Sequence, residues 1–162
     1  MVNLFTGESS DEYFGGELTP AARRMLDQLA TATPAEFESL LWTAQVSSPD
    51  CLPVYYLLYK YHASRRQFDL AEKAARSGLL HAAQQAGLPA DWQAAEAGCA
   101  DFSHTGPARF WLFTLKALAF ILLRQGRTEE ASAALNKIRQ VHGGASGLGD
   151  DVIAALLEGS RN

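Results

Sequence analysis

The stretch that most restricts the possible folds is residues 107–125, PARFWLFTLKALAFILLRQ, which would be apolar around nearly its whole circumference as a helix. Pro107 favours a helix start there, because a proline at the first helical position gives up no hydrogen bond, and Gly126 ends the run. A helix that is apolar on every side must be covered by its own chain or by another molecule. The longest apolar run within it, Phe110 to Leu123, is interrupted by Thr114 and Lys116 and is too short to span a membrane. We therefore expect the central helix of a soluble protein.

Helix start signals recur before this segment. Thr19, followed by a proline, predicts a first short helix, and Thr33 with Glu36 three residues later predicts a capping box at the start of a second. Two helices joined by about three residues are expected to pack antiparallel. Asp50 is expected to cap a third helix that runs to residue 64.

Apolar periodicity predicts further helices over residues 68–86 and 128–141, and a short last one after Asp150. Residues 87–106 are expected to be a connector with one short helix around 92–97, and the acidic, glycine-bearing residues 1–17 a tail. No segment alternates β-branched and polar residues with period two. The predicted fold class is all-α: one domain over residues 18–162, built from antiparallel helical hairpins with about six to eight helices.

Charge and cysteine content exclude several classes of protein. The 162 residues carry 14 basic and 18 acidic side chains, a net charge of −4 with the signs interspersed, whereas a nucleic-acid-binding domain needs a concentrated basic face. The amino terminus lacks the basic start and apolar run of a secretory signal, so we expect a cytoplasmic protein. Cys51 and Cys99 lie far apart without a CxxC pattern and are expected to be free thiols.

The usual catalytic motifs are absent. The chain contains no GxxxxGK[ST], GxGxxG, GxSxG or HExxH sequence, and none of its four histidines are three or four residues apart. We therefore expect no enzyme, no cofactor and no metal. Cys99, Asp101 and His104 form the one compact set of potential ligands, so the alternative hypothesis is a helical protein that responds to a small molecule or metal through the loop 92–104.

Residues 112–141 resemble one tetratricopeptide repeat, a helix-turn-helix unit whose small and large residues occupy fixed positions. The matching residues are Leu115, Leu118, Ala119, Leu122, Gly126, Ala131 and Leu135. Residues 52–81 match more loosely: Tyr55, Leu58, Phe68 and Ala71 fit, but Tyr59 occupies a small-residue position, His62 a large apolar one and Arg66 that of the turn glycine. The resemblance implies tetratricopeptide-like hairpins rather than a regular solenoid.

In the tetratricopeptide family, the first helices of the repeats line a groove that binds peptides or partner helices. By this resemblance, the residues facing such a groove are Tyr56, Lys60, Phe113, Lys116, Phe120, Leu123 and Arg124. The implied function is a non-enzymatic module for protein–protein interaction, and the apolar helix expected over residues 107–125 leaves a homodimer open as a further possibility.

GLPADW at residues 87–92 and PARFWLFTLKALAFILLRQG at 107–126 are similar to segments of small helical-repeat proteins encoded among bacterial nitrogen-fixation genes. This resemblance implies an adaptor, chaperone or assembly factor accessory to nitrogenase or its cofactor assembly. A nitrogenase component or assembly protein is then the expected partner, and no catalytic residues carry over.

Overall fold

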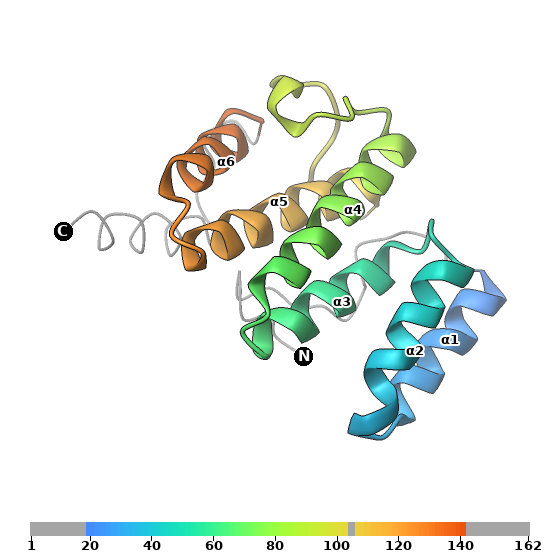
Figure 1. The fold of residues 1–162 in the computed structure, drawn as a ribbon. Helices are drawn as coiled ribbons and strands as arrows, with labels where there is room; N and C mark the ends of the chain where they lie inside the picture. The colour runs from blue at the N-terminus through green and yellow to red at the C-terminus, as the bar shows by residue number, and fades with distance from the viewer. Residues whose placement is uncertain (1–18, 104–105, 142–162) are drawn as a thin grey trace.

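The computed structural model describes residues 19–103 and 106–141, and the part it describes is entirely helical (Figure 1). Its elements are α1 (Pro20–Thr31), α2 (Pro34–Ser47), α3 (Leu52–Ser64), α4 (Phe68–Ala86), the short 3-10 helix η1 (Trp92–Ala94), α5 (Pro107–Arg124) and α6 (Thr128–Val141). The predicted all-α class is confirmed. The expected tail at residues 1–17 and the last short helix after Asp150 lie outside the described residues.

The helices form three successive antiparallel hairpins. In the two larger hairpins, α4 packs between α3 and α5, and α6 covers the other side of α5. The α1–α2 hairpin lies beside α3, with α2 as its main contact. No helix among the described residues combines the length and the apolar character needed to cross a membrane.

Two of the predicted helix caps are present. The Thr19 hydroxyl accepts a hydrogen bond from the Ala22 amide at 3.1 Å, and the Thr33 amide donates to the Glu36 carboxylate at 3.4 Å in a capping box. The predicted cap of α3 was wrong by one residue. A turn in which the Cys51 amide donates to the Ser48 carbonyl at 3.0 Å places Cys51, and not Asp50, at the cap position.

The turns of the two larger hairpins share one backbone geometry. After α3, the Gln67 amide donates to the His62 carbonyl at 2.8 Å; after α5, the Arg127 amide donates to the Leu122 carbonyl at 2.9 Å. Each turn needs one residue in the left-handed region, as glycine-closed helix ends usually do. Gly126 holds φ +77° in the second turn, and Arg66 holds φ +60° in the first.

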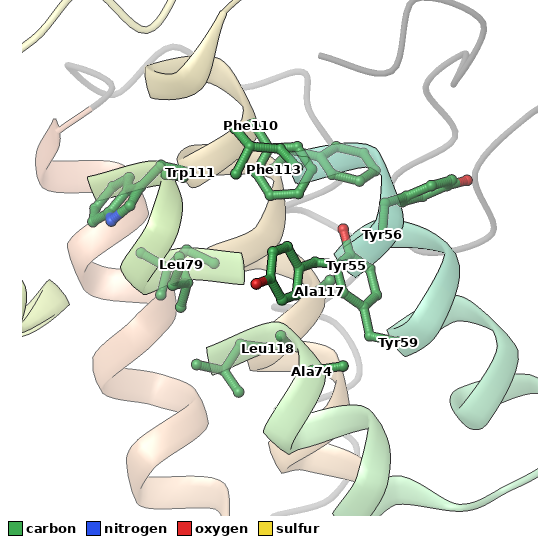
Figure 2. Packing of buried hydrophobic residues seen from close by; sticks show 14 of the residues in the cluster. Tyr55, Tyr56, Tyr59, Ala74, Leu79, Phe110, Trp111, Phe113, Ala117 and Leu118 are labelled. Carbon is green, nitrogen blue, oxygen red and sulfur yellow. The ribbon is translucent and has the colours of Figure 1, made fainter. Parts of the chain in front are cut away.

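The hydrophobic core is centred on α5, whose aromatic side chains meet those of α3 (Figure 2). Its largest fully buried side chains include Phe110, Trp111 and Phe113 of α5, together with Tyr55 and Tyr59 of α3. Small residues on α4 allow the three helices to approach closely. At Gly78 an added Cβ would lie 3.0 Å from Tyr55 Cβ. The chain's own residues therefore cover the segment that the sequence required to be covered.

Candidate partner-binding surface

The groove residues predicted on α3 and α5 divide into a buried and an accessible group. Tyr56, Phe113 and Lys116 are only 2%, 2% and 1% exposed. The Tyr56 and Phe113 rings lie 5.9 Å apart, so both belong to the contact between α3 and α5. In this conformation a partner would not touch these three side chains directly, and their role in binding stays a prediction.

The accessible group contains Lys60, Phe120 and Leu123, which are half-buried, and Arg124, which is exposed. Both cations of this group lie over aromatic rings: Lys60 Nζ is 5.5 Å from the centre of the Tyr56 ring, and the Arg124 guanidinium is 5.5 Å from that of Phe68. A ring face attracts a cation without neutralising it. The accessible group therefore combines apolar and basic side chains.

Sequence reasoning missed a second basic feature, at the turn between α3 and α4. Arg65 and Arg66 are both exposed, and the Arg65 guanidinium lies 5.4 Å from the centre of the Tyr61 ring. Arg124, at the end of α5, lies over Phe68 at the start of α4. We call Arg65, Arg66 and Arg124 the turn arginines. The Arg65-Arg66 pair and the arginine at a glycine position were visible in the sequence, but the position of Arg124 over Phe68, two residues after Arg66, was not.

An ion-pair network ties α4 to the α5–α6 hairpin. Arg76 pairs with Glu72 at 2.7 Å and with Glu130 at 2.5 Å, while Arg127 pairs with the same two carboxylates at 2.7 and 2.6 Å. Burial disfavours the charged form of Glu72 and Glu130, but hydrogen bonds and charges from the two arginines outweigh it and lower the pKa of both carboxyls. These four charges satisfy one another, so we assign the network to stability.

The connector between α4 and α5 is held against the helices. Trp92, Ala95 and Phe102 are buried, and Lys137 Nζ donates to the Ala95 carbonyl at 2.6 Å. The Asp101 carboxylate accepts hydrogen bonds from the Ser103 amide and hydroxyl at 3.0 and 2.5 Å, closing a local turn.

Of the three potential ligands predicted in the connector, Cys99 is exposed and His104 lies outside the described residues. Within the described ranges, no group of three or more His, Cys, Asp or Glu side chains is arranged to hold a metal ion. Cys51 and Cys99 are both free thiols. Burial raises the pKa of the Cys51 thiol, and a raised pKa lowers the fraction of reactive thiolate.

The sequence is similar to that of a protein encoded beside a nitrogen-fixation gene. Over 140 residues the chain is 29% identical to an uncharacterised 19.8 kDa protein from the 5′ region of nifW in Azotobacter chroococcum mcd 1. The match covers 85% of this chain and 78% of that protein. No family model and no solved structure matches the chain. The predicted similarity to proteins encoded among nitrogen-fixation genes is supported, while the tetratricopeptide resemblance stays a prediction.

Proposed function

We propose that this chain is a non-enzymatic protein-binding module, an adaptor, chaperone or assembly factor that is accessory to nitrogenase or to its cofactor assembly. The observation that carries the proposal is the similarity, along 85% of the chain, to a protein encoded in the 5′ region of nifW. Genes that serve one process are often grouped in bacteria, so the location of that relative's gene points to the process.

The surface chemistry supports a protein partner. Half-buried Phe120 and Leu123 lie on the same helix as exposed Arg124, and half-buried Lys60 lies on α3, which contacts α5. Interfaces are enriched in aromatic residues and arginine, which supply apolar area and directional hydrogen bonds. The accessible part of the predicted groove combines both.

The process is tested by genetics. Deleting the gene in its native host should lower acetylene reduction by cells fixing nitrogen, while growth on ammonium should remain unchanged. A plasmid copy of the wild-type gene should restore the activity. Equal acetylene reduction with and without the gene, during both induction and steady state, would refute the accessory role.

Binding is tested by affinity capture from nitrogen-fixing cells under anaerobic conditions, followed by mass spectrometry. The wild-type chain should retain a nitrogenase component or assembly protein, and the double variant Lys60→Glu, Arg124→Glu should lose it. Lys116 is not changed, because reversing a charge that is 1% exposed would threaten the fold.

A matched control reverses two exposed arginines of α1, with Arg23→Glu and Arg24→Glu. It makes the same change in net charge at a distant surface and should retain the partner. If wild type captures no nitrogenase-related protein, or if the control loses it equally, the proposed binding surface is wrong.

A further inference from the structure

Two of the turn arginines, Arg66 and Arg124, border an open hollow at the end of the two larger hairpins, and Arg65 precedes Arg66 in the same turn. The hollow has a volume of about 480 Å³, and its lining residues are Arg66, Gln67, Phe68, Asp69, Leu70 and Gln125. Phe68 and Leu70 are half-buried, so the hollow offers apolar surface between polar edges. Arg124 stands over the Phe68 ring, which places a second guanidinium at its edge.

The charge around this hollow is unbalanced. Among the described residues, Arg65, Arg66 and Arg124 have no carboxylate within ion-pair distance. The neighbouring charges of Glu72, Glu130, Arg76 and Arg127 cancel within their own network. Asp69 is the one acidic residue in the described lining, and its carboxylate already accepts a hydrogen bond from Gln125 Nε2 at 2.9 Å. In the lining and at its edge, Arg66 and Arg124 therefore stand against the single carboxylate of Asp69, on a chain whose net charge is −4.

Two of the turn arginines are positioned without being neutralised. The Arg65 guanidinium lies over the Tyr61 ring at 5.4 Å from its centre, and that of Arg124 lies over the Phe68 ring at 5.5 Å. A guanidinium stacked on a ring keeps its N–H groups, which lie in its plane, free to donate to a planar acceptor. Carboxylates match this geometry with two parallel hydrogen bonds.

We propose that the turn arginines dock an acidic segment of the protein partner, with one of its apolar side chains entering the hollow over Phe68 and Leu70. This inference rests on the proposed function and adds the location and chemistry of the contact. An extended segment carrying Asp or Glu on both sides of a leucine supplies carboxylates for the guanidinium groups and apolar area for the hollow. Three arginines on an acidic chain are too few for the phosphate neutralisation that nucleic-acid binding uses.

The test uses a synthetic probe and the full chain. A fluorescein-labelled peptide of Asp, Glu and Leu is titrated by fluorescence anisotropy, alongside a peptide in which Asn and Gln replace Asp and Glu. The double variant Arg66→Gln, Arg124→Gln should weaken binding of the acidic peptide at least tenfold. The double variant Arg23→Gln, Arg24→Gln, with the same loss of charge on α1, should bind as wild type does. Circular dichroism and urea unfolding verify that all variants fold.

In the peptide titration, three results would overturn the inference: no binding of the acidic peptide by wild type, equal binding of the amide peptide, or equal weakening by the α1 variant. A short single-stranded DNA that binds more tightly than the peptide through the same arginines would assign the surface to phosphate. Partner capture separates the two proposals. If the Arg66→Gln, Arg124→Gln variant still captures a nitrogenase-related partner, the docking site is wrong and the proposed function stands. If the acidic peptide binds through the arginines but wild type captures no nitrogenase-related partner, the docking site stands and the proposed function is wrong.

Discussion

Replacing Arg66 with glycine should stabilise the protein and weaken its binding. A residue other than glycine in the left-handed backbone region costs about 1–2 kcal/mol of stability. Replacing it with glycine removes that cost but destabilises the fold by roughly 0.5–1 kcal/mol, because glycine has more conformational freedom in the unfolded chain. Because φ at Arg66 is +60°, both terms apply, and the midpoints of these ranges give a net gain of about 0.75 kcal/mol. For a chain of this size that raises Tm by about 1–4 °C. The same change removes a guanidinium from the hollow and should weaken binding of the acidic peptide several-fold.

Two further variants isolate the backbone effect. Arg66→Ala loses the guanidinium but keeps the strained conformation, so its stability should stay near that of wild type while its peptide affinity falls as in Arg66→Gly. Gly126→Ala makes the opposite change in the other turn, where it introduces a side chain in place of glycine. A Cβ there would meet no atom within 4 Å, so its whole cost is backbone strain. It should destabilise the fold by about 0.5–1 kcal/mol. Urea unfolding followed by circular dichroism measures all three. If Arg66→Gly is no more stable than Arg66→Ala, the strain argument is wrong.

Three other predictions concern packing, pH and thiol reactivity. Gly78→Ala should destabilise the fold by about 1 kcal/mol, as measured by urea unfolding. A Cβ at 3.0 Å from the Cβ of Tyr55 costs more than the gain of about 1 kcal/mol that alanine brings in helix propensity. A variant as stable as wild type, or more stable, would contradict this prediction. The pKa of the Glu72 carboxyl is lower in the folded protein than in the unfolded chain. The ionised carboxyl therefore stabilises the fold at pH values above its unfolded-state pKa, and this stabilisation is lost as pH falls through its folded-state pKa. Glu72→Gln should therefore lower the urea midpoint at pH 7 and become indistinguishable from wild type in acid, and a difference that persists in acid would refute this. Since burial raises the pKa of the Cys51 thiol and Cys99 is exposed, Ellman's reagent should modify Cys99 rapidly and Cys51 slowly; a single rate for both would show that Cys51 is accessible.

Most helix boundaries were predictable because their signals are local. A threonine and a glutamate within one turn contain all the groups of the capping box before α2, and Gly87, with φ +73°, ends α4 where the sequence predicted. The start of α3 was not predictable to the residue. Its cap depends on a turn between α2 and α3, in which Ser48 accepts from Cys51, and on Gln85 of α4, whose side-chain amide donates to the Asp50 carbonyl at 2.8 Å.

For the candidate surface, the sequence predicted which helix faces contribute to it but not how exposed each side chain is. The repeat pattern predicts which residues of α3 and α5 share one side, and of these Lys60 is half-buried and Arg124 is exposed. The pattern does not show how deeply each side chain is buried once the helices pack. Tyr56 and Phe113 pack against each other across the contact between α3 and α5, and Lys116 is 1% exposed, which no periodicity in the sequence indicated.

The comparison of the two hairpin turns gives the strongest reason to seek function at Arg66. Both turns close with the same hydrogen-bond pattern and need a residue with positive φ at the same position. Gly126 adopts this conformation without strain, whereas Arg66 adopts it at a cost in stability. Among the described residues, the Arg66 side chain makes no hydrogen bond or ion pair that would offset the cost. A strained residue without structural compensation is expected where its side chain serves binding. Because Arg66 lines a hollow bordered by a second arginine, the unfavourable backbone places a charge where an acidic segment would meet both.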